Sequence, residues 1–350
     1  MPEGYFHRLN AQSATRFWIN NPTVSEAKKA IAAGAISCTT NPAYVSKLLQ
    51  KDESRTSVQE AIEPVIQTIP DDQVAADLVQ RKLVKLIMDL FLPLYVNNQG
   101  KAGFVSIQGN PFMDEDTDHI IKEAIEYKKL GKNFIAKIPV TRSGLEAMEV
   151  LIAEDIPIIA TEVMALDQAV TVCELYLRVS KGSSRNPLFF LTHITGIFDE
   201  YLQMVVQKQK INISRENLIQ AGCIVARKQY QLFKKRGYPG IMLGGGAREI
   251  YHFTEMVGSE MHITINWAGT ADKIIEKDLP IINRMDTPAP QYVVDELSEK
   301  LTDFRKAYNE GSIAIPEFKD FGPVSLFRDS FIKGWSCLLQ MIQESRKEIK

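Results

Sequence analysis

The chain has 350 residues, of which 45% are hydrophobic and 24% charged, a globular composition with material for a large core. Its formal net charge of −2 gives no overall attraction to nucleic acid or to anionic membranes, so we expect neither as a partner. The N-terminal segment lacks the apolar stretch of a signal peptide, and no uncharged apolar run reaches the roughly 18 residues of a membrane helix. We therefore expect a soluble cytoplasmic protein.

The cysteines and histidines give no sign of a metal site. Four cysteines lie far apart without a CxxC pair, which is typical of free thiols in a reducing compartment. No two of the five histidines have the spacing of metal ligands, so we expect no metal. His193 falls at the end of an expected strand, whereas the other four are expected at the surface or in the core.

Short apolar runs alternate with helical patterns along the first 280 residues. Strands separated by helices are joined by right-handed crossovers into a parallel sheet. Eight such units, without a Gly-x-Gly-x-x-Gly fingerprint after the first strand, favour a closed (β/α)8 barrel over an open dinucleotide-binding sheet. The expected strands are 15–20, 35–41, 103–108, 133–140, 156–164, 187–194, 240–246 and 261–266.

Capping signals predict several of the intervening helices. A helix over 23–34 ends at Gly34, and a helix that begins at the Ser214 cap runs to Gly237. The segment 48–100 between the second and third strands contains an apolar pattern at 82–96, which predicts a buried helix.

The last 70 residues exceed a minimal barrel. We expect a catalytic barrel domain over 1–280 and a helical extension over 281–350 that packs on it, with helices at 289–311 and 325–349. The sequence leaves two roles open for this extension, which are to cover one end of the barrel or to form a contact in a homo-oligomer.

Nearly every expected strand ends in a side chain that forms hydrogen bonds. In barrels of this type the chemistry lies at the C-terminal ends of the strands, so these side chains predict a polar pocket there. Asn41 and the two threonines before it form one wall of that pocket. The residues concerned are Asn20, Thr39, Thr40, Asn41, Gln108, Lys137, Thr161, Thr192, His193, Arg248 and Asn266.

Lys137 is the most informative of these residues. It stands between Ala136 and Ile138 in an apolar run that is expected to be an interior strand. One interpretation is a lysine at a strand edge whose ammonium reaches water. The other is a desolvated lysine with a lowered pKa, whose amine attacks a ketone to form a Schiff base. The residue pattern leaves both open.

The run GGGAR at the end of the seventh strand has two interpretations. Gly245 and Gly246 permit backbone N–H groups to approach an anion, with Arg248 as the charge partner. The alternative is an ordinary turn from strand to helix. We favour the anion site because the seventh unit of such barrels is a frequent phosphate site.

Three segments resemble motifs of the transaldolase family, the Schiff-base enzymes that include the fructose-6-phosphate aldolases. GAISCTTNPAYV is similar to the family's Gly/Ala-x-Thr-Thr-Asn-Pro-Ser motif. FIAKIPVTRSGLEAMEVL is similar to its Lys-Ile/Val-Pro-x-Thr-x-x-Gly-x-x-Ala motif. QYQLFKKRGYPGIMLGGGAR resembles the helix and strand that lead to the family's phosphate turn, and the resemblance runs in order from about residue 15 to 280.

This resemblance implies roles for the strand-end residues. Lys137 matches the Schiff-base lysine, Gln108 the Glu or Gln that holds the catalytic water, and Thr161 a water-binding threonine. The substrate is expected to be a sugar or sugar phosphate, and no cofactor is required. Residues expected to bind it are Asn20, Thr39, Thr40, Asn41, Gly245, Gly246 and Arg248.

The chain also departs from the family pattern at the first and sixth strands. Asn20 stands where the family has the aspartate that moves the proton of the substrate C4 hydroxyl, and Gly196 stands where it has a phosphate-binding arginine. We hypothesise that proton transfer has moved to His193, a residue suited to acid–base work. The substrate phosphate is then held more loosely or is absent.

The expected activity is transfer of a three-carbon ketol unit between sugars through Lys137. Three alternatives stay open at this point. They are an aldolase that uses no acceptor sugar, a Schiff-base lyase for another carbonyl compound, and a barrel that binds a sugar phosphate without catalysis.

Overall fold

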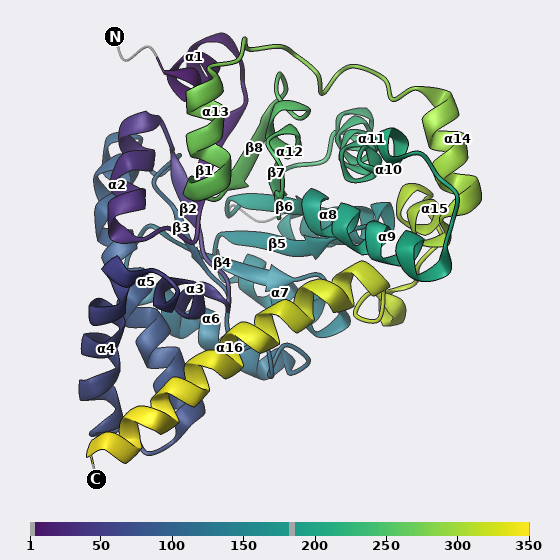
Figure 1. The fold of residues 1–350 in the computed structure, drawn as a ribbon. Coiled ribbons are helices and arrows are strands. Elements are labelled where there is room, and N and C mark those ends of the chain that lie inside the picture. The colour runs from purple at the N-terminus through teal and green to yellow at the C-terminus, as the bar shows by residue number, and fades with distance from the viewer. Residues whose placement is uncertain (1–3, 182–185, 350) are drawn as a thin grey trace.

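Eight parallel strands close into a barrel in the computed structural model, which describes residues 4–181 and 186–349 (Figure 1). The strands pair in chain order, and β1 also pairs with β8. Each falls within one of the expected ranges, which confirms the (β/α)8 barrel. The strands are β1 Arg16–Asn20, β2 Ser37–Thr39, β3 Val105–Ile107, β4 Phe134–Pro139, β5 Ile158–Val163, β6 Phe189–Ile194, β7 Ile241–Gly245 and β8 Met261–Ile265.

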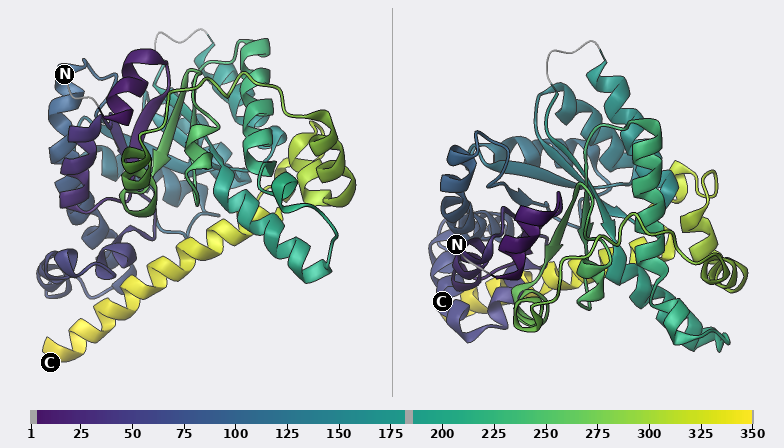
Figure 2. Two further views of the ribbon diagram at one scale, coloured as in Figure 1. Left: turned by 45° about the horizontal axis from the view of Figure 1, so that its top comes forward. Right: turned by 90° about the horizontal axis from the view of Figure 1, so that it is seen from above.

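Helices separate the strands and cover the outside of the barrel (Figure 1, Figure 2). In the described ranges, no helix is long and apolar enough to cross a membrane. The helices are α1 Tyr5–Gln12, α2 Val24–Ala33, α3 Tyr44–Leu49, α4 Asp52–Ile66, α5 Asp72–Asn97, α6 Thr117–Lys128, α7 Arg142–Ala153, α8 Leu166–Ser180, α9 Thr195–Gln209, α10 Arg215–Leu218, α11 Ala221–Arg236, α12 Tyr251–Thr254, α13 Asp272–Lys277, α14 Gln291–Lys300, α15 Thr302–Tyr308 and α16 Gly322–Ile349, with the short turns η1 Trp267–Ala271 and η2 Ile315–Glu317.

Local signals fix the start of α2 and the C-terminal ends of α2 and α11 where the sequence predicts them. Thr23 accepts a hydrogen bond from the backbone N–H of Glu26, and the Glu26 carboxylate accepts one from Thr23 N, which makes a capping box. Gly34 and Gly237 end these helices with φ of +109° and +62°. Glycine adopts this left-handed conformation without the strain of a side chain.

Tertiary contacts break two of the expected helices. The segment 214–237 forms α10 and α11, because Gly222 in the first turn of α11 donates its N–H to Asp199 on α9 at 2.7 Å. The segment 289–311 divides into α14 and α15 at Leu301, whose backbone is extended and whose side chain is buried in the core.

An apolar layer fills the lower interior of the barrel. Its members form a core cluster separate from the larger one that lies between strands and helices. We call this layer the floor, because the interior side chains two positions further along the strands lie above it. The floor consists of Trp18, Phe104, Ile135, Ile159, Phe190 and Leu243.

The long helix α16 crosses the end of the barrel at which the strands finish (Figure 1, Figure 2). Arg328 on α16 donates to both carboxylate oxygens of Asp114 after β3, at 2.8 and 2.7 Å. Trp335 donates its indole N–H to Gln73 on α5 at 2.9 Å and belongs to the same apolar core cluster as the outer barrel residues. The helical extension thus covers one end of the barrel. The boundary at residue 280 and a contact in a homo-oligomer stay predictions.

Asp167 anchors the loop that leads into α16. Its two carboxylate oxygens accept hydrogen bonds from the backbone N–H groups of Gly311, Ser312 and Ile313 at 2.6 to 2.8 Å. Asp167 lies in the first turn of α8, where the partial positive charge of the helix N-terminus also favours an anion. One buried carboxylate therefore ties the extension to the barrel.

Asp167→Ala is expected to lower the free energy of unfolding by about 2 to 3 kcal/mol, because it leaves three backbone donors without their charged acceptor. Urea denaturation measures this change. Asp52→Ala is the control, since the Asp52 side chain is 97% exposed, and it should change stability by less than about 0.5 kcal/mol. Equal stability of the two variants would contradict the anchoring role.

Candidate active site

Directly above the floor, the interior of the barrel becomes polar. The strand residues two positions beyond Trp18, Ile135, Ile159, Phe190 and Leu243 face the same interior space. On these five strands, the apolar layer is therefore followed, two residues further along, by a layer that is mostly polar and includes one amine. These residues are Asn20, Lys137, Thr161, Thr192 and Gly245.

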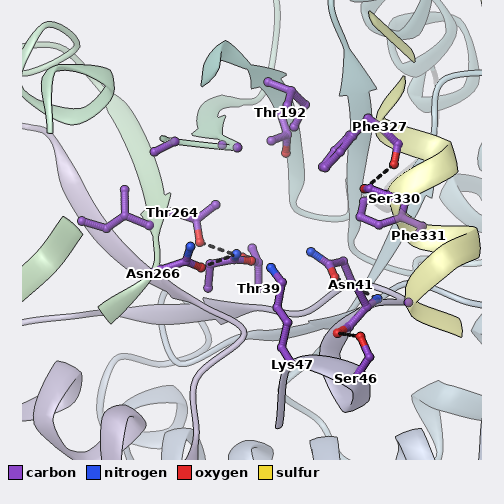
Figure 3. Close-up of a pocket in the computed structure, with 18 of the residues that line it drawn as sticks. Thr39, Asn41, Ser46, Lys47, Thr192, Thr264, Asn266, Phe327, Ser330 and Phe331 are labelled. Carbon is purple, nitrogen blue, oxygen red and sulfur yellow. Dashed lines mark hydrogen bonds between the residues drawn. The ribbon is translucent and has the colours of Figure 1, made fainter. Parts of the chain in front are cut away.

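Above this layer lies a cavity of about 360 Å³ (Figure 3). The ends of β1, β2, β4, β6, β7 and β8 line it from below, and α3 and α16 line its sides. Phe327, Ser330 and Phe331 on α16 face the strand ends across the cavity, as Figure 3 shows. Its size lies within the range of small-molecule sites.

Lys137 lies in the barrel interior rather than at a sheet edge. It is 7% exposed, its Nζ lies 3.4 Å from the Thr40 carbonyl oxygen, and it stands 5.7 Å from the Phe331 ring centroid. The pKa of Lys137 is lowered to about 8. Burial is the main cause and the ammonium of Lys47 contributes, whereas the Glu162 carboxylate raises this pKa. A sizeable share of neutral amine is therefore present near neutral pH.

Asn20 belongs to a chain of neutral hydrogen bonds on the side of the cavity where Figure 3 shows Thr39, Thr264 and Asn266. Its Nδ2 donates to Asn266 Oδ1 at 2.9 Å, and its Oδ1 accepts from the Thr39 hydroxyl at 3.0 Å. The Thr39 hydroxyl also lies 2.6 Å from that of Thr264. These contacts fix the orientation of the Asn20 amide, which offers hydrogen bonds but no titratable proton.

Thr40 and Asn41 contribute in different ways. The Thr40 hydroxyl donates to the Ser106 carbonyl at 2.6 Å, so it points toward β3, and Thr40 contacts Lys137 through its own carbonyl oxygen. Asn41 lines the cavity, and its Oδ1 accepts from Ala43 N at 3.1 Å. The expected wall is therefore made by Thr39 and Asn41, without the Thr40 hydroxyl.

Gln108 and Thr161 are buried in the barrel but do not line the cavity. Gln108 donates its Nε2–H to Glu162 Oε1 at 2.9 Å. Gln108 Oε1 and Thr161 Oγ1 have no hydrogen-bond partner among the described residues. Both positions can still accept or donate a bond to water, which fits the role that the sequence suggests.

The expectation for His193 is corrected by the structure. Thr192 and Ile194 line the cavity, so the intervening residue of β6 faces the opposite way, toward the helices. His193 Nε2 lies 3.1 Å from the Gly222 carbonyl on α11, and burial lowers the pKa of His193 to about 4. His193 is therefore a neutral core residue and cannot exchange protons with a ligand in the cavity.

The turn after β7 lines the cavity, but part of its backbone is already bonded. The N–H groups of Arg248 and Glu249 donate to His252 Nδ1 at 3.2 and 3.0 Å. His252 Nε2 in turn lies 2.9 Å from an oxygen of the buried Asp199. These two amides are thus not available to an anion. The charge that the turn offers is the Arg248 side chain, whose Nε also contacts Glu200 at 2.8 Å.

Gly196 allows this turn to pack directly against α9. A Cβ at position 196 would lie 2.3 Å from the Gly246 carbonyl oxygen and 2.8 Å from Arg248 N. Gly246 itself has φ of +67°, and a Cβ there would meet Ile194. The space beside Gly196 is therefore filled by backbone, so a long side chain cannot occupy it.

Several residues of the site are missed by the sequence analysis. Lys47 on α3 reaches into the cavity between Thr39 and Asn41 in Figure 3, and its pKa falls to about 8 through burial and the charges of Arg248 and Lys51. Glu162 carries a signal in the sequence, a carboxylate within an apolar strand. The α16 residues carry none, since only folding brings them to the strand ends.

No cluster of three His, Cys, Asp or Glu side chains with the arrangement of a metal site occurs within residues 4–181 and 186–349. The polar groups that surround the cavity are amines, amides, hydroxyls, a guanidinium and the thiol of Cys337.

The family described as Transaldolase/Fructose-6-phosphate aldolase matches residues 17–312 of the chain. The chain belongs to this family. A transaldolase of Trichodesmium erythraeum is 29% identical over 162 residues, which are 41% of this chain and 43% of that protein. A transaldolase of Arthrobacter sp. is 30% identical over 159 residues, 42% of either chain. One of Mycobacterium bovis is 24% identical over 219 residues, 57% of this chain and 55% of that one. The chain spans about half the length of these relatives.

Within the transaldolase and aldolase family, this member differs at two places that the structure explains in physical terms. Asn20 is held by Thr39 and Asn266 as a neutral amide, so the first strand supplies no acid or base. Gly196 replaces an arginine of the family pattern and admits the backbone of the β7 turn. A phosphate group would therefore need other cations, of which Lys47 and Arg248 line the cavity.

Lys137→Met is expected to stabilise the protein near neutral pH. The pKa of Lys137 is about 8 in the folded chain, below the 10.5 of an ordinary lysine. Folding therefore favours the neutral amine, and the parent loses on the order of 2 kcal/mol of stability as the pH falls from 10 to 7. Urea denaturation across this range should show that loss in the parent and in Lys129→Met, an exposed control. If the free energy of unfolding of Lys137→Met depended on pH as that of the parent does, the lowered pKa of Lys137 would be contradicted.

Proposed function

We propose that the protein is a transaldolase-like enzyme that moves a three-carbon ketol unit between sugars through a Schiff base on Lys137. The observation that carries this proposal is the buried amine of Lys137, with its pKa lowered to about 8, at the base of a polar cavity. An amine of this kind attacks a ketose carbonyl without a cofactor.

In this proposal the amine of Lys137 adds to C2 of the ketose, and loss of water gives a cationic imine. The imine draws the electrons of the C3–C4 bond while the C4 hydroxyl gives its proton to a water molecule, so cleavage releases an aldehyde and leaves an enamine on the lysine. A transaldolase passes the enamine to an acceptor aldehyde, whereas an aldolase protonates it. The name of the relatives, transaldolase, favours the first outcome.

The polar walls of the cavity suit a sugar. Asn41, Asn266 and the Thr39–Thr264 pair present amide and hydroxyl groups around the space above Lys137 (Figure 3). Sugar hydroxyls are both donors and acceptors, and amides offer both as well. Gln108 and Thr161, with unpartnered oxygens below this space, would position the water of imine formation and hydrolysis.

The cationic side of the cavity suits a phosphate. Lys47, Arg248 and Lys333 line it, and the residues that line the cavity include no carboxylate. Lys47 has no ion-pair partner among the described residues, although it is largely buried and its pKa is lowered to about 8. An anionic group on the substrate would supply the missing charge, so we infer a sugar phosphate rather than a free sugar.

Borohydride reduction in the presence of fructose 6-phosphate, fructose or dihydroxyacetone tests the Schiff base. We expect an added mass in the intact parent protein and in Lys129→Met, and none in Lys137→Met, because the adduct forms on the buried amine. An adduct that persists in Lys137→Met would place the chemistry on another lysine. No adduct with any donor, together with a thermal shift by sugar phosphates, would favour a binding protein.

Lys47→Met is expected to raise KM for fructose 6-phosphate about tenfold, which corresponds to about 1.4 kcal/mol, and to leave KM for unphosphorylated donors unchanged. The reason is that the cation faces the substrate phosphate. Steady-state kinetics measure this difference. Lys51→Met is the control, since Lys51 pairs with Glu26 outside the cavity. An equal change for both kinds of donor would contradict a phosphate contact.

A further inference from the structure

A buried carboxylate, Glu162, faces the interior of the barrel at the end of β5. The pairing of β5 with β6 shifts register between Ala160 and Val163. Both of these belong to the outer apolar core, so the two residues between them, Thr161 and Glu162, face inward together. Glu162 has φ of +63°, which is strained for a residue with a side chain. The strand thus departs from regular geometry at the point where it brings this carboxylate inside.

A hydrogen bond holds the carboxylate on β5, the strand beside that of Lys137. Glu162 Oε1 accepts from Gln108 Nε2 at 2.9 Å. Gln108 follows β3 and Glu162 ends β5, while β4, the strand of Lys137, lies between them in the barrel. The bond therefore crosses the end of β4 inside the barrel.

One oxygen of this carboxylate is unsatisfied. Glu162 is 1% exposed, and its Oε2 has no hydrogen-bond partner among the described residues. Burying an oxygen without a hydrogen-bond partner is unfavourable, and more so when the oxygen is charged. Nothing in the packing of the barrel requires this charge, so it points to a ligand, a water or a proton at that oxygen.

The two groups act on one another electrostatically. The Glu162 carboxylate is the one group that raises the pKa of Lys137, and the ammonium of Lys137 lowers that of Glu162. Burial dominates for both and brings the pKa of Lys137 down to about 8 and that of Glu162 up to about 7. Asp114 raises the pKa of Glu162 further and Arg328 lowers it, whereas Lys47 lowers that of Lys137.

We propose that Glu162 is the acid–base partner of Lys137, an inference that rests on the proposed Schiff-base function. The protonated carboxyl donates its proton to the hydroxyl of the carbinolamine that Lys137 forms with the ketose. The C–O bond breaks, water leaves, and a cationic imine remains beside the Glu162 carboxylate.

The reverse step balances in the same way. Water adds to the imine carbon, and the Glu162 carboxylate takes one proton from that water, which restores the neutral carboxyl and the carbinolamine. The electron pair of the C=N bond returns to the lysine nitrogen, and the carbinolamine then collapses to the ketose and the free amine. No oxidant, reductant or further reactant is needed.

The other candidates for this work are excluded by their surroundings. Asn20 carries no titratable proton, and His193 faces the helices. Asp114 has both carboxylate oxygens bonded to Arg328. Among the described residues, Glu162 is therefore the carboxylate that can serve Lys137 from within the barrel, and Gln108 holds it in place.

Glu162→Gln tests the proposal with two independent readouts, kcat and the pH at half-maximal trapping. Loss of the acid should lower kcat by about 10²- to 10⁴-fold. Loss of the negative charge should let Lys137 lose its proton more easily, so the pH at half-maximal trapping with cyanoborohydride and fructose 6-phosphate should move down. A residue that only supports the fold would lower the urea midpoint without this pH shift.

Two further variants complete the design. Glu123→Gln, which alters a buried carboxylate on α6 bonded to Asn110 N, should leave the trapping midpoint unchanged. Glu162→Asp keeps a carboxylic acid at this position, so its kcat should be higher than that of Glu162→Gln. This variant also tests the proposal if Glu162→Gln folds poorly.

A kcat of Glu162→Gln within about threefold of the parent, or an unmoved trapping midpoint, would overturn the role of Glu162 while leaving the Schiff base intact. Absence of an adduct in the parent would instead remove the proposed function and this inference together, so the two failures are distinguishable.

Discussion

In a closed barrel of parallel strands, every second side chain must face the interior, and this constraint decides what the site contains. The same alternation that places Trp18, Ile135 and Phe190 in the floor places Asn20, Lys137 and Thr192 above it. It also turns His193 outward, against α11. The polar layer is thus supported from below by tightly packed rings, which hold the amine of Lys137 in one place.

The second constraint is the cost of burying charge. The cavity gathers Lys47, Lys137 and Arg248 without a carboxylate in its lining, so burial disfavours the charged amines and repulsion between the cations adds to the effect. The pKa values of both lysines fall for this reason. In the proposed function an anionic substrate reduces the repulsion around Lys47, and the Glu162 carboxylate reduces it around Lys137. The excess of positive charge in the cavity therefore accounts for both proposed interactions.

The differences from the family pattern are linked through packing. With no side chain at Gly196, the backbone of the β7 turn lies against α9, and His252 takes up two of its amides. The cations that line the cavity are therefore the side chains of Lys47 on α3, Arg248 after β7 and Lys333 on α16. That arrangement depends on α16 lying across the strand ends, where Asp167 and the Arg328–Asp114 pair hold the extension.

The barrel, its eight strands and the position of Lys137 could be predicted from the sequence, because the period of the apolar residues, the glycines that end helices and the polar residues at strand ends are local signals. The sequence also predicts that six further residues lie around one pocket, and all six line the cavity. They are Asn20, Thr39, Asn41, Gly245, Gly246 and Arg248. Tertiary structure alone decided which face each strand-end residue presents, as His193 and Thr40 show, since one residue of register reverses the direction of a side chain.

Tertiary structure also decided what comes from far along the chain. The bulge that turns Glu162 inward depends on the pairing of β5 with β6, and α16 reaches the cavity about 190 residues after Lys137. Such contacts arise from packing between distant segments, and no local pattern encodes them.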